Sequence, residues 1–247
     1  MTEVATALVA TLVGILIGAS GVGGVLLISF LVLFTGLGIH QAAATSLFSF
    51  LFPGLLGSWL FHRKGSIEWR IAIPVCAGAV PASYLGTFVA SMTSARVLTI
   101  VVGLIIVVAG VNALLPRHGV RPRSNHVDRG TGLMLLGVGA ASGFGSGVSG
   151  AGGPVFSVPI MVALRYSALA AVGTSQVLQV VAAVAGSVGN LQRGLIDWRL
   201  AAVVAAFQLL GVTVGVRLAH SLPDRWLKAL AGLLCLVAGG LLVARAV

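Results

Sequence analysis

Two glycine-rich motifs hold the residues of this sequence whose type and spacing could bind a ligand. The first is GASGVGG at 18–24 and the second is GVSGAGG at 147–153, 129 positions later. Glycine costs about 1 kcal/mol relative to alanine inside a helix, so each motif predicts an interrupted helix. A helix that restarts after an interruption presents unpaired N–H groups and the positive end of its dipole, and both favour anions. The glycines predicted to contact an anion are Gly21, Gly23, Gly24, Gly150, Gly152 and Gly153.

A Thr-Ser pair follows each motif at a matching distance, about twenty residues on. Hydroxyl and amide N–H groups can donate hydrogen bonds to oxyanion oxygens. Equally, Ser and Thr in membrane helices bond to their own backbone or join neighbouring helices. The side chains predicted to complete the anion site are Thr45, Ser46, Thr174, Ser175 and Gln176.

The composition predicts a chain that spans a lipid bilayer many times. Of its 247 residues 58% are hydrophobic and only 8% are charged, whereas soluble domains carry about 25% charged residues. The net charge of +10 comes from Lys and Arg at the ends of apolar segments. That placement indicates topology control and contact with anionic lipid, and it disfavours nucleic acid as a partner.

The two halves of the chain align without a gap when the sequence is shifted by 129 positions. Thr45-Ser46 then falls on Thr174-Ser175, and GSIEWR at 65–70 falls on GLIDWR at 194–199. Gln176 and Gln179 have no polar counterpart in the first half, so the predicted site is chemically lopsided. We interpret the chain as an internal duplication with a first transmembrane repeat at 1–115, a basic linker at 116–130 and a second repeat at 131–247.

The predicted fold is an all-α polytopic membrane protein with four apolar segments in each repeat, about eight in all. The segments are at 4–36, 42–61, 71–92, 96–115, 132–164, 170–191, 200–220 and 226–246. The first segment of each repeat is too long for one straight crossing and too short for two. It is either one tilted span broken at the glycines, which gives parallel repeats, or a re-entrant pair of half-helices, which gives inverted repeats. Both arrangements place most basic residues on the side of the linker, which predicts a cytoplasmic linker.

Two other kinds of chemistry are disfavoured by the same residues. GASG and GVSG match the GxSG pattern of an intramembrane serine protease, but all five histidines lie in predicted loops or at segment ends. The five acidic residues also lie there, whereas cation transporters usually keep a carboxylate inside the membrane. We therefore expect a protein that is not an enzyme, that needs no cofactor or metal, and that handles an anion.

The duplicated order of these motifs resembles the TauE/SafE sulfite exporter family, also called the toluene sulfonate uptake permeases. The second half, GVSGAGGPVFSVPIMVAL followed by AAVGTSQ, matches better than the first. The first half departs at Ser29-Phe30, where the family often has Val-Pro, and at Val25, where a further glycine is common. The resemblance implies a bacterial inner-membrane permease for sulfur-containing anions such as sulfite or organosulfonates.

We therefore expect a secondary transporter that binds a small oxyanion in mid-membrane between the two repeats. An uncoupled anion channel is the alternative, and an intramembrane enzyme is a distant third. The exact substrate, the direction of transport, the coupling ion and any assembly into a homo-oligomer are left open by the sequence.

Overall fold

The computed structural model describes residues 2–92 and 129–223, together with single positions between 94 and 114 and between 225 and 244. Every regular element in that part of the chain is an α-helix. The elements are α1 (Thr2–Ser20), α2 (Gly24–Phe34), α3 (Ile39–Ser49), α4 (Leu51–Arg63), α5 (Trp69–Met92), α7 (Arg129–Ser149), α8 (Pro154–Ala163), α9 (Ala168–Leu191) and α10 (Trp198–Ser221). Most of the predicted segments at 96–115 and 226–246, and residues 116–128 of the linker, lie outside the described residues.

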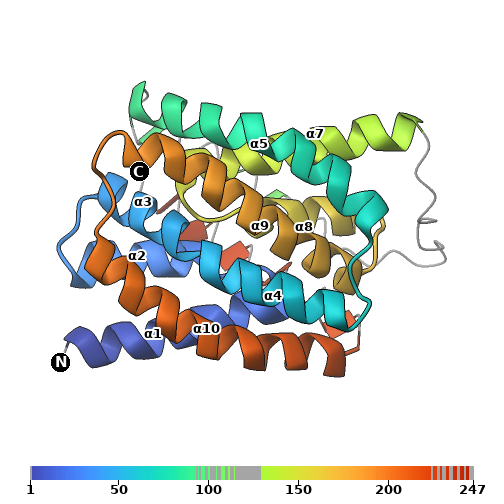
Figure 1. The fold of residues 1–247 in the computed structure, drawn as a ribbon, viewed down its shortest axis with the longest axis horizontal. Helices are drawn as coiled ribbons and strands as arrows, with labels where there is room; N and C mark the ends of the chain where they lie inside the picture. The colour runs from blue at the N-terminus through green and yellow to red at the C-terminus, as the bar shows by residue number, and fades with distance from the viewer. Residues whose placement is uncertain are drawn as a thin grey trace.

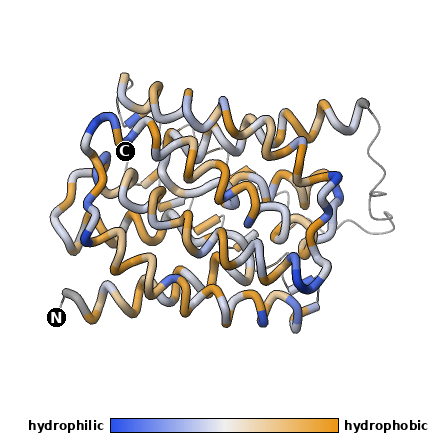
Figure 2. Tube along the Cα trace, viewed as in Figure 1, coloured by the Kyte–Doolittle hydropathy of each residue, from blue (hydrophilic) through white to orange (hydrophobic). Residues whose placement is uncertain are grey.

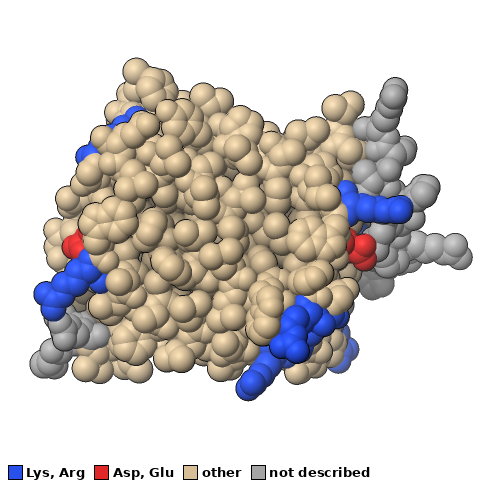
Figure 3. Space-filling model, viewed as in Figure 1, with Lys and Arg blue, Asp and Glu red and all other residues tan. Residues whose placement is uncertain are grey.

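The helices lie side by side, and α5, α9 and α10 run between two opposite ends of the molecule (Figure 1). In the described part of the chain, five helical stretches are long and apolar enough to cross a membrane, at 39–63 (α3 and α4 together), 69–92, 130–149, 168–191 and 198–221. Apolar residues follow the helices, and hydrophilic residues gather at the turns at both ends (Figure 2). Charged side chains likewise lie at both ends of the visible face, with an uncharged belt between them (Figure 3). The prediction of an all-α, multi-pass membrane protein is confirmed for the described residues.

The chain reverses direction at each glycine motif. A side chain on Gly23 would lie 3.0 Å from the carbonyl oxygen of Val13, ten residues earlier, so α2 folds back along α1. In the second motif a side chain on Gly145 would lie 2.8 Å from the ring of Phe156, so α8 folds back along α7. α2 and α8 have 11 and 10 residues, which corresponds to about half the thickness of a bilayer core. Of the two arrangements left open by the sequence, the re-entrant pair agrees with these contacts.

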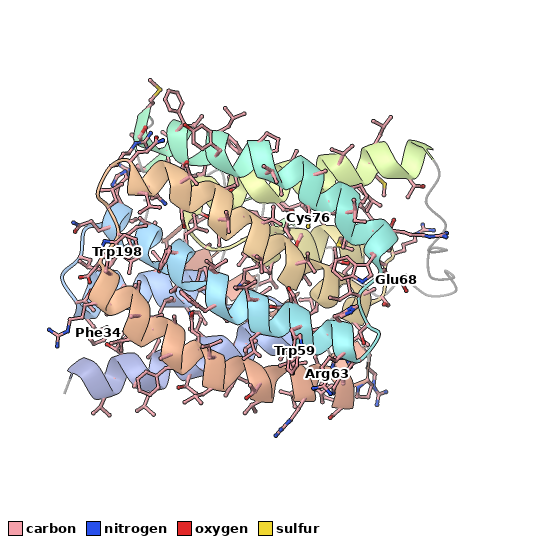
Figure 4. All side chains as sticks on the ribbon, viewed as in Figure 1. Phe34, Trp59, Arg63, Glu68, Cys76 and Trp198 are labelled. Carbon is pink, nitrogen blue, oxygen red and sulfur yellow. The ribbon has the colours of Figure 1, made fainter. Side chains whose placement is uncertain are left out.

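The two hairpins enter the molecule from opposite ends. The N-terminus and Phe34, the last residue of α2, lie at the left of the view, where Trp198 also lies (Figures 1 and 4). α7 begins at the opposite end, which holds Arg63 and Glu68 (Figure 4). Glu68 and Trp198 belong to the two copies of the acid-Trp loop, so the copies lie at opposite ends.

Glycines lie in the contacts between α1 and α10 and between α5 and α7. α1 packs on α10, where a side chain on Gly18 would lie 2.9 Å from the amide nitrogen of Val216. α7 packs on α5, where a side chain on Gly147 would lie 3.0 Å from the amide nitrogen of Thr87. Small residues permit such close approach of helix backbones in membranes. The first helix of each half therefore packs on a helix of the other half.

Candidate functional site

The two glycine motifs meet in the interior of the molecule. A side chain on Gly24 would overlap the carbonyl group of Ala151, so the two turns are in backbone contact. The ring of Phe50 lies against both turns. It is 3.0 Å from the place that a Cβ atom on Gly24 would take and 3.4 Å from the equivalent place on Gly152. Ala151 and Phe50 are fully or almost fully buried. The start of α2 and the start of α8 are thus brought to one place, from segments 129 positions apart in the sequence.

Left-handed glycines end the first helix of each hairpin. Gly21 has φ +76° and Gly150 has φ +68°, a conformation that costs other residues about 1–2 kcal/mol. The amide of Gly21 donates to the carbonyl of Ile17 (2.9 Å) and that of Gly150 to the carbonyl of Ser146 (2.8 Å). These glycines therefore stop α1 and α7 and redirect the chain.

The serines of the GxSG patterns cap these same helix ends. Ser20 donates to the carbonyl of Leu16 (2.9 Å) and accepts from the amide of Val22 (3.3 Å). Ser149 likewise donates to the carbonyl of Gly145 (2.6 Å) and accepts from the amide of Ala151 (3.2 Å). Both hydroxyls therefore have backbone partners and a structural role, and neither bonds to a histidine of the described residues.

The starts of α2 and α8 leave backbone donors at the meeting point. Gly23 and Gly153 are the N-caps, and neither start has a side-chain cap. The carbonyls of these two caps accept the first hydrogen bonds of their helices. Hydrogen bonds from the amides of Gly24 and Gly153 are not found among the described residues, and Pro154 occupies the first turn of α8, where an N–H is dispensable. Two helix N-termini thus point their positive ends at one region.

Polar residues of α9 border this region. A side chain on Gly21 would lie 3.0 Å from Ser175 Oγ, which donates to the carbonyl of Val172 (2.8 Å). Gln176 donates through Nε2 to the carbonyl of Ile17 (2.8 Å), and its Oε1 has no hydrogen-bond partner in the described structure. Ser175 is thus committed to its own helix, whereas Gln176 ties α9 to the last turn of α1.

Gln179 lies one turn further along α9 and holds the chain between α3 and α4. Its Nε2 donates to the carbonyl of Phe50 (2.9 Å), which also accepts from the amide of Gly54 (3.1 Å). Gln179 and Phe50 are counterparts under the 129-residue shift. The lopsided pair of glutamines was visible in the sequence, but this direct contact of Gln179 with its own counterpart was not predicted.

The two Thr-Ser pairs are fully buried but differ in their bonding. Thr45 Oγ1 accepts a hydrogen bond from the amide of Asp197 (3.1 Å), so it anchors the loop before α10. The hydroxyls of Ser46 and Thr174 have no hydrogen-bond partner in the described part of the chain. A buried hydroxyl without a partner costs about 1–3 kcal/mol, so Ser46 and Thr174 are the better candidates for ligand contact.

The surroundings of the motifs are polar but uncharged. Among the described residues, every buried polar side chain is Ser, Thr, Asn, Gln or Tyr, and none is charged. Within the same residues, no group of three His, Cys, Asp or Glu side chains could hold a metal ion. Backbone dipoles, hydroxyls and amides are therefore the groups that can act on a ligand here.

Comparison with known proteins gives one consistent result. A family model described as sulfite exporter TauE/SafE matches residues 6–242. The chain is 28% identical over 240 residues to the probable membrane transporter protein YdhB of Bacillus subtilis, covering 96% of this chain and 98% of that protein. It is also 28% identical over 232 residues to the probable membrane transporter protein y4hK of Sinorhizobium fredii, covering 90% of each. No solved structure was found to match the chain.

Proposed function

Because the chain belongs to the sulfite exporter TauE/SafE family, we propose that this membrane transporter carries a small sulfur-containing oxyanion such as sulfite or an organosulfonate. The anion would bind in mid-membrane, between the two glycine turns. Its oxygens would accept hydrogen bonds from the backbone at Gly23, Gly24, Gly152 and Gly153. Ser46 and Thr174 would add hydroxyl donors.

One observation carries this proposal: the backbone contact between Gly24 and Ala151. It brings together two helix starts that come from separate segments of the chain. Helix N-termini that point at a mid-membrane site are a recurring means of holding anionic substrate groups in transporters. The absence of buried charge among the described residues fits an anion that must be released as well as bound.

We further propose that the two halves are inverted repeats, with one re-entrant hairpin and three crossings each. The reversal of the chain at both motifs and the opposite placement of Glu68 and Trp198 support this arrangement. Transport would then alternate the access of the site between the two ends of the molecule. The basic linker would face the cytoplasm of a bacterial inner membrane, since basic residues favour that side.

The test is anion flux into liposomes that contain the purified protein. Ser46→Ala and Thr174→Val remove hydroxyls that bond to nothing else in the described protein. A hydrogen bond to a charged group contributes about 1.5–3 kcal/mol. Each variant should therefore raise the anion concentration that gives half-maximal flux about 10-fold to 100-fold. Thermal unfolding should be unchanged or slightly improved, because each variant removes an unpaired buried polar group.

Ser187→Ala is the matched control, because Ser187 is on the same helix as Thr174 and its buried hydroxyl is also without a partner. Its flux should equal that of the unmodified protein. Unchanged flux for sulfite and for an organosulfonate in both Ser46→Ala and Thr174→Val would contradict the site. Counterflow of labelled anion that saturates would identify a carrier rather than an uncoupled channel.

A further inference from the structure

Three serines inside the second hairpin have hydroxyls that the described protein leaves unbonded. They are Ser142 and Ser146 on α7 and Ser157 on α8. All three are 0% exposed. They are distinct from the residues assigned above to the anion between the glycine turns.

Serine in a helix does not need to be left in this state. Ser149, three residues beyond Ser146 on α7, donates to the backbone carbonyl four residues earlier, and Ser20 on α1 does the same. Such a bond satisfies a hydroxyl at little cost. Three buried hydroxyls of one hairpin that do not use it point to a polar occupant that competes with the backbone.

Among the side chains of the first hairpin that the structure describes, this cluster has no equivalent. The positions 129 residues earlier are Val13, Ile17 and Ile28, and all three belong to one buried apolar cluster. Branched aliphatic side chains thus fill the first hairpin, whereas smaller hydroxyl side chains stand at the matching positions of the second. Ser58 and Ser187 are counterparts of each other and both lack partners, so that pair does not contribute to the asymmetry.

Helix periodicity places two of the serines on one face of α7. Ser142 and Ser146 are one turn apart and continue the face of α7 that begins with Val138. Val138 belongs to a buried apolar cluster that includes Val158 and Met161 of α8 together with residues of α4, α5, α9 and α10. The contact between Gly145 and the Phe156 ring places the first turn of α8 at the same level.

We propose that the interior of the α7–α8 hairpin is a hydrated path by which the anion passes between the glycine turns and the end of the molecule where α7 begins. This inference rests on the proposed function and adds its route. Hydroxyls suit such a path, because each can donate to an oxyanion or to water without holding a full charge in place. The first hairpin, filled by Val13, Ile17 and Ile28, remains dry.

The path is testable by the reaction of single cysteines with a small anionic thiol reagent. Ser142→Cys and Ser146→Cys are made in a protein whose Cys76 and Cys235 are replaced by alanine. Val13→Cys and Ile17→Cys, at the matching positions of the first hairpin, are the controls. The reagent is 2-sulfonatoethyl methanethiosulfonate, which carries the sulfonate group of the proposed substrate class.

We expect both serine-derived cysteines to react at least 10-fold faster than the two controls in liposome-embedded protein. Methanesulfonate, which does not react with thiols, should slow the reaction at Ser142→Cys and Ser146→Cys only. Equal rates at matched positions of the two hairpins, or no reaction at either serine position, would overturn the inference.

Flux of the cysteine-free protein separates this inference from the proposed function. Anion flux without labelling at Ser142→Cys and Ser146→Cys would overturn the hydrated path and leave the proposed function standing. Labelling in a protein that carries no sulfite or organosulfonate would overturn the proposed function and support a hydrated hairpin with another occupant.

Discussion

Replacement of Gly21 by alanine tests whether the glycine turn is needed for its conformation alone or also for close packing. Gly21 has φ +76°, and its new Cβ would lie 2.8 Å from Cγ2 of Val158 and 3.2 Å from Cβ of Pro154. Gly36, in the loop after α2, has φ +70° and no heavy atom within 4 Å of the same position. Gly36→Ala therefore carries the conformational cost without the packing cost.

The conformational cost and the packing cost can be estimated separately. Left-handed backbone costs alanine about 1–2 kcal/mol at both positions. At Gly21 the Val158 methyl must also move by roughly 0.7 Å to reach ordinary carbon contact, and overpacking of this kind costs about 1–3 kcal/mol. Alanine restricts the unfolded chain equally in the two variants, so that contribution cancels in the comparison.

The assay is thermal unfolding of the purified protein in detergent. A change of 1 kcal/mol shifts the melting temperature by about 2–4 °C for a chain of this size. We therefore expect Gly21→Ala to melt about 2–12 °C below Gly36→Ala, and Gly36→Ala to melt below the unmodified protein. Equal melting temperatures for the two variants would refute the close packing of the first turn against α8.

Three further outcomes follow from single contacts. Gln208→Met should raise the melting temperature by about 2–6 °C, because the Gln208 amide is fully buried and both its polar atoms lack partners in the described structure. A lower melting temperature would mean that the amide has hydrogen-bond partners in the protein. Arg165→Gly should raise it by about 1–4 °C, because Arg165 has φ +73° at the position that matches Gly36; a fall would show that the Arg165 side chain is needed. Gln179→Leu should lower it by about 2–6 °C through loss of the bond to the Phe50 carbonyl, whereas Gln192→Leu, at an exposed position, should leave it unchanged.

The long helices could be located from the sequence because their apolar runs and starting residues agree. The segment predicted at 200–220 is α10, and Asp197 begins it by accepting the amide of Leu200 (3.0 Å). The segment predicted at 170–191 is α9, which Ser167 begins in the same manner with the amide of Ala170 (3.1 Å). Asp and Ser are preferred N-caps, so both starts were readable from residue type.

The path of the chain at the glycine motifs could not be decided from the sequence. A broken span and a re-entrant pair contain the same residues and the same hydrophobicity. The choice depends on φ at Gly21 and Gly150, and glycine adopts both signs of φ with similar ease. Motif position was therefore predictable from the sequence, but motif geometry was not.

The ligand-facing residues were only partly predictable for a related reason. Thr45 and Thr174 are the same residue at matching positions, yet Thr45 bonds to the amide of Asp197 and Thr174 bonds to nothing described. Whether a buried hydroxyl is already satisfied depends on a loop about 150 residues away in the chain. The predicted set of eleven residues therefore stays a prediction, with Ser46 and Thr174 as its strongest side chains.

The packing of the helices constrains how access to the site could alternate. α1 and α10 come from different halves, as do α5 and α7, yet these are the pairs in which glycine brings backbones together. Pulling the two halves apart would expose both of these interfaces at once. Motion that keeps each pair intact and displaces the hairpin tips instead would separate the contacts of the two turns, among them Gly24 with Ala151, Gly21 with Val158, and the Phe50 ring with both turns.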